Sequence, residues 1–342
     1  MPTIKPLLGS LCLTLTLTLA VTGFALSAGA AEKTLTVYTY DSFVSDWGPG
    51  PKIKEAFEAE CGCNLDFVAL DSSIGILSRL RLEGSHGKAD LVLGLDMSLL
   101  AEAKATGLFQ PHDVMLPALQ LPMDWSDDTF LPFDFGHFAF IYDSEILADP
   151  PKSLRALVDA PEDLKILIQD PRTSTPGLGL MLWVRAVYGD DAPAAWQALS
   201  RKIVTVTKSW SEAYGLFLDG EAPMVLSYTT SPAYHMVVDG ETRYRAAAFE
   251  EGHYLQIEVA AMVKAAREPA LARQFLAFML TPGFQAAIPT GNWMFPVIGL
   301  EEGLPEAFDT LVKPETSLQF DPDELRQAQK AWLEEWLGAM VR

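Results

Sequence analysis

Two kinds of hydrophobic pattern alternate along this chain. Short apolar stretches rich in β-branched and aromatic residues predict strands, and stretches whose apolar positions recur every three or four residues predict helices. The first half contains predicted strands at 35–40, 64–70 and 89–95 and predicted helices at 51–60, 74–83 and 97–105. This alternation is typical of a parallel sheet covered by helices on both faces.

A second unit of the same kind follows. Its strands are predicted at 137–142, 164–169, 204–207, 223–228 and 254–263, and its helices at 176–188, 192–201, 211–218 and 321–340. No Gly/Ser linker separates the units, so we expect two lobes joined by strand-like crossovers near 130–136 and 252–255. The predicted fold class is α/β, each lobe having a central, mainly parallel sheet flanked by helices, with a ligand cleft between the lobes.

The approximate lobe boundaries follow from these crossovers. The first lobe is predicted to contain residues 31–132 plus 254–300, and the second to contain residues 133–253 plus 301–342. A chain of 342 residues is long enough for two such lobes.

The first 30 residues differ from the rest. Lys5 is the only charged residue before Glu32, positions 7–28 are apolar or Thr/Ser, and an Ala-Gly-Ala sequence ends at Ala30. This order is typical of a secretory signal peptide, which we place at residues 1–30. A transmembrane anchor is the alternative, but the stretch is only moderately hydrophobic. Cys12 follows Leu11 inside the apolar run, which argues against a lipoprotein.

Later segments and the net charge narrow the possible partners. No later segment approaches the ~20 apolar residues that span a bilayer, so we expect a soluble, exported mature chain that is not membrane-embedded. The formal net charge is −20. Such a charge opposes binding to nucleic acid or anionic membranes and mildly favours cations.

Cys61 and Cys63 are the only cysteines after the predicted signal peptide. In an oxidising compartment they are candidates for a local disulfide, which we favour although the ring would be small. Two free thiols or a metal site are the alternatives, but a lone C-x-C lacks the further ligands of a zinc site.

Aromatic residues gather where strands and helices are predicted to end. They are Tyr40, Trp47, Trp210, Tyr228, Tyr234 and Trp293. Any one of them is compatible with an ordinary place in the core. Several at the rim of one predicted cleft indicate a binding site for a flat, cationic ligand, because aromatic faces attract cations.

Hydroxyl residues accompany these aromatic residues. Thr173, Ser174 and Thr175 follow Arg172 at a predicted strand-to-helix junction, with Thr175 expected as the helix N-cap and Pro176 in the first turn. An ordinary cap is one interpretation, and an anion site at the helix N-terminus is the other. Ser209 and Glu212 fit a capping box beside Trp210.

Catalytic signatures are absent. The sequence has no H-E-x-x-H, G-x-S-x-G or P-loop motif, and its histidines lack metal-ligand spacing. We expect His137 to be a core histidine. We predict neither enzymatic activity nor a cofactor.

Long segments resemble the periplasmic thiamine-binding proteins of bacterial ABC importers. The resemblance runs from about Leu35 to the C-terminus and is carried by 36–43, 46–51, 170–179, 210–217, 226–235, 251–254 and 289–293. It implies a type II periplasmic-binding fold that binds thiamine, thiamine monophosphate and thiamine diphosphate. It also implies delivery to a membrane permease driven by a cytoplasmic ATPase. A monomer fits that role.

The resemblance also implies site residues. Ser174 and Thr175 would meet the phosphate end, and aromatic residues would surround the rest. The pocket wall would contain Trp210 and the run Tyr228, Thr229, Thr230, Ser231 and Pro232, with Tyr40, Trp47, Tyr234 and Trp293 completing it. The chain departs from the family at Asp71-Ser72-Ser73, where an acidic residue followed by Asp-Gly can occur. We keep Ser72 and Ser73 as candidate contacts.

Two other functions stay open at this point. A thiamine-degrading enzyme would need a cysteine nucleophile in the cleft, and only Cys61 and Cys63 are available. A binder of ferric ion or a polyamine is the other alternative. Ferric sites usually have adjacent tyrosines, and Tyr228 and Tyr234 are six apart. A polyamine needs several carboxylates in the cleft, for which the candidates are Asp41, Asp46, Asp71 and Asp96.

Overall fold

A computed structural model describes residues 2–3 and 33–340, so nearly all of the predicted signal peptide (residues 1–30) lies outside the described residues. The first half of the described chain alternates strands and helices as predicted. Its elements are β1 (Thr34–Tyr40), α1 (Asp41–Val44), α2 (Gly50–Cys61), β2 (Asn64–Leu70), α3 (Ser73–Glu83), β3 (Leu91–Asp96), α4 (Leu100–Ala105) and β4 (Phe109–Gln110). β1 pairs in parallel with both β2 and β3.

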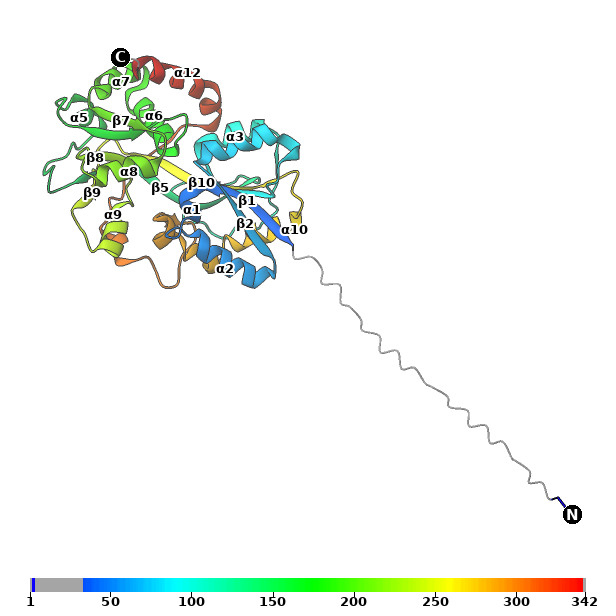
Figure 1. Ribbon diagram of the computed structural model, residues 1–342. Coiled ribbons are helices and arrows are strands. Elements are labelled where there is room, and N and C mark those ends of the chain that lie inside the picture. The colour runs from blue at the N-terminus through cyan, green and yellow to red at the C-terminus, as the bar shows by residue number, and fades with distance from the viewer. Residues whose placement is uncertain (1, 4–32, 341–342) are drawn as a thin grey trace. The chain divides into compact units, whose positions relative to one another are not determined.

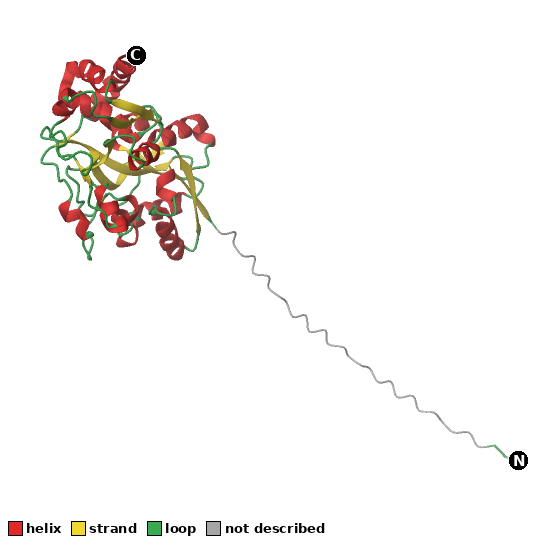
Figure 2. Cartoon of the chain, turned by 60° about the vertical axis from the view of Figure 1, so that its left-hand side comes forward, coloured by secondary structure: helices red, strands yellow, loops and turns green. Residues whose placement is uncertain are grey.

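The second half contains another parallel arrangement, in which β6 pairs with β7 and β8. Its elements are α5 (Leu154–Asp159), β6 (Ile166–Gln169), α6 (Thr175–Tyr188), α7 (Ala192–Ser200), β7 (Ile203–Thr207), α8 (Trp210–Leu218), β8 (Met224–Tyr228), α9 (Pro232–Tyr234) and β9 (Tyr244–Ala246). The chain ends in α10 (Pro269–Phe278), α11 (Pro282–Gln285), β11 (Phe295–Pro296), β12 (Ser317–Leu318) and α12 (Pro322–Met340). Figure 2 shows the strands at the centre with helices around them.

Two long strands join these halves. β5 (Phe130–Asp143) pairs with β10 (His253–Val263) over residues 130–137 and with β8 over residues 138–142. The strand order is therefore β2-β1-β3-β10-β5-β8-β6-β7. In Figure 1, β5 and β10 run between the group around α2 and α3 and the group around α5 to α8.

The prediction for β5 was wrong at its start, because the strand begins at Phe130 rather than at residue 137. Pro132 and Gly136 interrupt the strand pattern in the sequence. The ladder with β10 is irregular beside Pro132, and a proline without an N–H is tolerated at such a point. The predicted crossover segment at 130–136 is thus part of a continuous strand.

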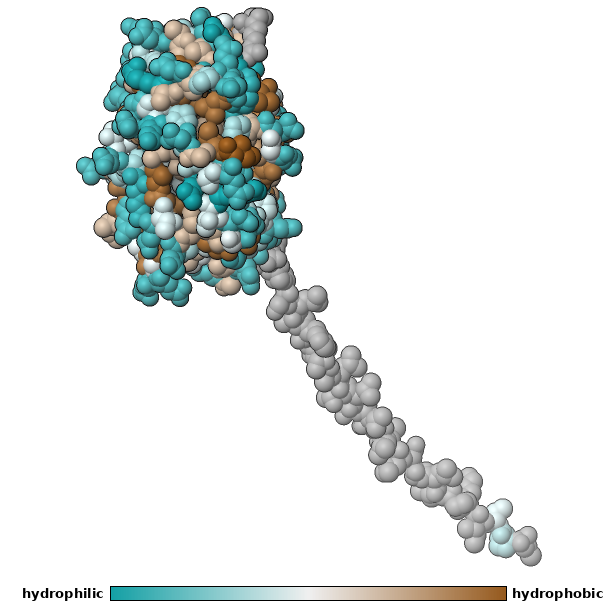
Figure 3. Space-filling model, turned by 90° about the vertical axis from the view of Figure 1, so that its left-hand side faces the viewer, coloured by the Kyte–Doolittle hydropathy of each residue, from teal (hydrophilic) through white to brown (hydrophobic). Residues whose placement is uncertain are grey.

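The core lies on both sides of this sheet system. One cluster gathers around Trp183, Phe140 and Tyr254, and another around Phe57, Phe275 and Phe284. Their burial removes large aromatic surfaces from water. The face shown in Figure 3 is mostly hydrophilic, with hydrophobic residues in small groups.

Helix α12 covers elements of both halves, since it packs on α6 and α7 and also on α4. The boundaries predicted for the lobes stay a prediction. Among the described residues, none of the helices has the length and apolar character needed to span a membrane.

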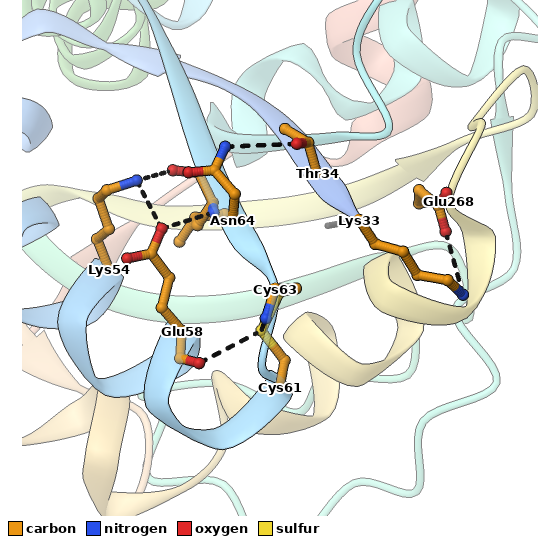
Figure 4. The surroundings of a disulfide bond; sticks show 9 residues. Lys33, Thr34, Lys54, Glu58, Cys61, Cys63, Asn64 and Glu268 are labelled. Carbon is orange, nitrogen blue, oxygen red and sulfur yellow. Dashed lines mark hydrogen bonds and ion pairs between the residues drawn. A yellow bond between two sulfur atoms is a disulfide. The ribbon is translucent and has the colours of Figure 1, made fainter. Parts of the chain in front are cut away.

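Cys61 and Cys63 are joined in a disulfide between the end of α2 and the start of β2. Gly62 between them has φ of +61°, a conformation that glycine adopts without strain. Figure 4 shows Glu58 beside this bridge, where its carboxylate accepts hydrogen bonds from Lys54 Nζ (2.7 Å) and the Leu65 N–H (2.8 Å). The bridge lies at the opposite end of β2 from Asp71, roughly 25 Å away along the strand.

Candidate functional site

A cavity of about 340 Å³ lies where the ends of several strands and helices meet. Its volume falls in the range of small-molecule sites. Most of the predicted site residues line it, namely Tyr40, Trp47, Ser72, Ser73, Ser174, Thr175, Trp210, Tyr228, Ser231, Tyr234 and Trp293. The fold therefore brings segments from both halves of the chain to one place.

Thr229, Thr230 and Pro232 do not line the cavity. The two threonines are fully buried, and the Thr230 hydroxyl points to Met294 Sδ at 3.8 Å. The two threonines lie in the turn between β8 and α9, and Pro232 is the first residue of α9. The lining of this cavity therefore does not include them, and their place in the pocket wall stays a prediction.

Trp210 begins one aromatic wall of the cavity. Its Nε1 donates a hydrogen bond to Ser227 Oγ at 2.7 Å, and its ring stacks on Tyr214 with a centroid separation of 5.1 Å. Ser227 Oγ in turn lies 2.7 Å from Ser231 Oγ. The hydrogen bond and the stack together fix the orientation of the indole.

Trp293 and Tyr234 form another part of the wall, with ring centroids 5.4 Å apart and planes at 88°. Trp293 has φ of +54°, which is uncommon for a bulky residue. Gly291, two residues before Trp293, lies so close to Pro49 that a Cβ on it would stand 2.7 Å from the Pro49 backbone. This contact ties the Trp293 loop to the loop of Trp47, which is half exposed at the rim of the cavity.

The corner at the start of α6 differs in one detail from the prediction. The N-cap is Ser174 rather than Thr175, and its hydroxyl makes no capping hydrogen bond. Arg172 is held by Asp170, with Nε–Oδ1 at 2.9 Å, and does not line the cavity. The Thr173 hydroxyl donates to the Lys208 carbonyl at 2.7 Å. The buried Ser174 hydroxyl and the helix N–H groups are therefore the groups this corner presents.

The N-termini of α3 and α8 also reach the cavity. Ser72 caps α3 by accepting from the Gly75 N–H at 3.2 Å, and Ser209 caps α8 by accepting from the Glu212 N–H at 3.3 Å. Three helix N-termini thus converge on one space, and each favours negative charge. This arrangement can bind an anionic group without a basic side chain.

Two contacts beside the cavity join opposite halves of the chain. Thr175 Oγ1 donates to Ser73 Oγ at 3.1 Å, and Lys208 forms an ion pair with Asp71. Asp71 therefore has a protein partner in this structure. Both members of the ion pair are exposed, so the pair contributes little to stability.

The opposite end of the cavity is acidic. Glu258 of β10 lines it and accepts from the Tyr40 hydroxyl at 2.8 Å. Burial raises the pKa of Glu258 to about 7 and raises the pKa of Asp96 to about 6. Burial and the nearby Glu258 carboxyl raise the pKa of Asp134 well above its ordinary value. No Lys, Arg or His lines the cavity as the structure describes it.

Sequence reasoning missed Gln256, Glu258 and Asn292. Gln256 and Glu258 alternate with apolar residues in β10, which is the pattern of a strand with one solvated face. In the structure both faces of β10 are buried. The signal available in the sequence was that Gln256 and Glu258 are polar residues in a strand expected to cross between the lobes. Asn292 stands directly before Trp293 in a segment that the resemblance already included.

The described side chains do not form a metal site. Among the described residues, no group of three or more His, Cys, Asp or Glu side chains is arranged to hold a metal ion. His137, predicted as a core histidine, is buried with Nε2 2.7 Å from Ser317 Oγ.

A two-lobed α/β protein with an aromatic cavity between strand ends has the form of a solute-binding protein. The chain belongs to the bacterial extracellular solute-binding protein family, whose sequence model matches residues 50–286. It is 56% identical to the thiamine-binding periplasmic protein of Escherichia coli, over 91% of this chain and 95% of that protein.

Solved structures agree with this membership. A periplasmic thiamin binding protein superposes with a TM-score of 0.89 at 56% identity, covering 91% of this chain and 97% of the other. The ferric binding protein from Campylobacter jejuni superposes with a TM-score of 0.74 at 20% identity, covering 90% and 100%. The second likeness shows the shared fold alone. The type II periplasmic-binding fold predicted from the sequence is therefore confirmed.

Proposed function

We propose that this chain is the extracytoplasmic binding component of an ABC importer and that it binds thiamine in the aromatic cavity. The observation that carries the proposal is a cavity with aromatic walls, an acidic floor and no basic lining residue. Its support from relatives is the 56% identity to a thiamine-binding periplasmic protein. Thiamine has a permanent cation in its thiazolium ring, which suits aromatic faces and nearby carboxylates.

Thiamine monophosphate and thiamine diphosphate belong to the same proposal. The corner of Ser174, Ser72 and Ser209 offers hydroxyls and helix N–H groups to the phosphate end. Lys208 lies beside this corner at the cavity mouth, where it pairs with Asp71. A phosphate would thus be bound mainly by neutral donors and helix dipoles.

The role is binding and delivery without chemical change to the ligand. A thiamine-degrading reaction by the mechanism considered above needs a free cysteine at the ligand. Cys61 and Cys63 are joined to one another, and neither lines the cavity. The partner is the membrane permease with its cytoplasmic ATPase. The protein acts as a monomer in the periplasm, and residues 1–30 are its export signal. On binding, the first lobe (residues 31–132 plus 254–300) closes onto the second lobe (residues 133–253 plus 301–342).

Tryptophan fluorescence of the refolded, ligand-free mature chain tests binding and selectivity together. Thiamine should change the emission saturably at one site per chain, since three tryptophans, Trp47, Trp210 and Trp293, line the cavity. Putrescine and ferric citrate should not compete. Competition by putrescine would instead support a polyamine binder, and chromatography of the released ligand should return unaltered thiamine.

Delivery is tested in cells. A thiamine auxotroph of Escherichia coli that lacks its own binding protein should regain growth on nanomolar thiamine when this chain is exported. The Trp210→Ala variant, expressed at the same level, should not restore growth. Growth restored by the Trp210→Ala variant would contradict the proposal that thiamine is bound in the aromatic cavity before delivery.

A further inference from the structure

Three carboxyl side chains lie in one row across the central strands. Glu258 of β10 is the register partner of Asp96 on β3 and of Asp134 on β5. Directly opposed residues in antiparallel strands point to the same face. The pairing of β10 with β5 is irregular directly after Glu258, and its pairing with β3 is irregular directly after Val259. Such irregularities often change the direction of a side chain beside a functional site.

Among the described residues, the groups that hydrogen-bond to the Asp134–Glu258 pair are neutral. Asn292 Nδ2 donates to Asp134 Oδ2 at 2.6 Å and lies 3.2 Å from Glu258 Oε2, which also accepts from the Tyr40 hydroxyl at 2.8 Å. Both carboxyls are buried, with 0% of Asp134 and 5% of Glu258 exposed. A buried charge without a positive partner is costly. A negative charge on this pair would therefore have no positively charged side chain beside it among the described residues.

One buried acceptor beside Glu258, Gln256 Oε1, has no hydrogen-bond partner in the described chain. Gln256 lies two residues before Glu258 on β10, on the same face, and both line the cavity. Asp134 shares a hydrogen bond with Glu258 and does not line the cavity. Native structures satisfy nearly all buried polar atoms, so the Gln256 acceptor indicates a ligand that brings a donor or positive charge.

The groups that face Glu258 come from every neighbouring strand. They are Tyr40 of β1, Asp96 of β3, Asp134 of β5 and Tyr228 of β8. Burial raises the pKa of Glu258 to about 7 and that of Asp134 well above its ordinary value. In the empty cavity below neutral pH, both carboxyls therefore retain their protons.

We propose that Glu258 determines the cation specificity of the cavity, and that binding of a positively charged ligand drives one proton off the Asp134–Glu258 pair. The O–H bond of one carboxyl breaks, the proton passes to solvent, and the electron pair stays on the oxygen. The remaining proton is shared by the two carboxyls, so the pair carries one negative charge against the one positive charge of the ligand. This inference rests on the proposed function and names the residue that recognises the ligand's charge.

Calorimetric titration with thiamine at pH 6.5 and 8.5, each in two buffers of different ionisation enthalpy, measures the proton. Because burial raises the pKa of Glu258 to about 7, binding should release clearly more of a proton at pH 6.5 than at pH 8.5. The Kd should be about tenfold weaker at pH 6.0 than at pH 8.5. Unesterified thiamine is the probe because a phosphate would itself titrate in this range.

Glu258→Gln keeps the shape and removes the charge. Its Kd for thiamine should rise by about 30-fold or more at pH 8.5, and both the proton release and the pH dependence should disappear. Affinity for 3-deazathiamine, in which a neutral thiophene replaces the thiazolium, should fall far less. Glu83→Gln is the matched control, because Glu83 accepts from the Tyr38 hydroxyl at 2.8 Å outside the cavity.

The outcomes separate this inference from the proposed function. Wild type that does not bind thiamine contradicts both. Wild type that binds thiamine with no proton release at pH 6.5 overturns the inference alone, and this measurement needs no variant to fold. Equal losses of thiamine and 3-deazathiamine affinity in Glu258→Gln would overturn it too, since they would show a role in shape rather than charge.

Discussion

Replacement of Trp210 by alanine removes the aromatic face that the fold fixes most firmly at the cavity. The indole is held by the 2.7 Å hydrogen bond to Ser227 and by its stack on Tyr214. Tyr214 is itself anchored, because its hydroxyl lies 2.9 Å from His235 Nε2. Tyr214 therefore cannot move into the space left by the indole without breaking its contact with His235.

The expected loss follows from these contacts. A desolvated cation–π contact contributes ~2 kcal/mol. Loss of a stacking surface for a flat ring adds about 0.5–1.5 kcal/mol. The sum is about 2.5–3.5 kcal/mol, which corresponds to roughly 60- to 400-fold in Kd. Trp210→Phe retains a face and loses the bond to Ser227, so it should weaken binding by about tenfold at most.

Calorimetric titration of Trp210→Ala with thiamine measures this loss, and Trp332→Ala is the comparison. Trp332 lies on α12, buried against Phe320 with ring centroids 4.8 Å apart, and does not line the cavity. It should lower the melting temperature while leaving Kd unchanged in the folded protein. Equal effects of the two variants on Kd would refute the assignment of Trp210 to the binding wall.

Three further predictions concern charge, the phosphate end and the disulfide. Burial raises the pKa of Glu258 from 4.5 to about 7, so its contribution to the stability of the empty protein is present below pH 4.5 and is lost as pH rises through 7. Urea unfolding at pH 8.5 should therefore find Glu258→Gln more stable than wild type by up to about 3 kcal/mol, and no gain would contradict this. Ser174→Ala should weaken thiamine diphosphate binding by about tenfold and leave thiamine binding unchanged, because Ser174 Oγ makes no capping bond. The double variant Cys61→Ser, Cys63→Ser should lower the free energy of unfolding by about 1–2 kcal/mol and leave the Kd for thiamine unaltered. A changed Kd would contradict the placement of the disulfide away from the binding cavity.

The elements were predictable because their patterns are local. The strand at 64–70 and the helix ends near Gly84 and Gly189 follow from alternation, periodicity and glycine at the end of a helix. The start of β5 was not predictable, because Pro132 breaks the local strand pattern and is tolerated through an irregular pairing with β10. Pairing between distant segments leaves no such mark in a single sequence.

The aromatic residues of the site were predictable for a related reason. Tyr40, Trp210 and Tyr228 stand where strands end or helices begin, and those ends meet in an α/β fold. The direction of each side chain was not predictable. Thr229 and Thr230 share a turn with Ser231, yet only Ser231 lines the cavity.

The acidic floor was beyond local reasoning. Glu258 and Asp134 are separated by more than a hundred residues, and their proximity depends on the register between β10 and β5. In sequence each is one polar residue in an apolar strand. Their raised pKa values arise from burial that only the assembled sheet creates.

The central claim is that the aromatic cavity binds thiamine, and its most direct test is calorimetric titration of the refolded, ligand-free mature chain with thiamine, thiamine monophosphate and thiamine diphosphate. The account predicts tight one-to-one binding of all three. It also predicts that the phosphate esters lose affinity selectively when Ser174 is replaced by alanine. Absence of binding to all three ligands by a chain shown to be folded would contradict the account.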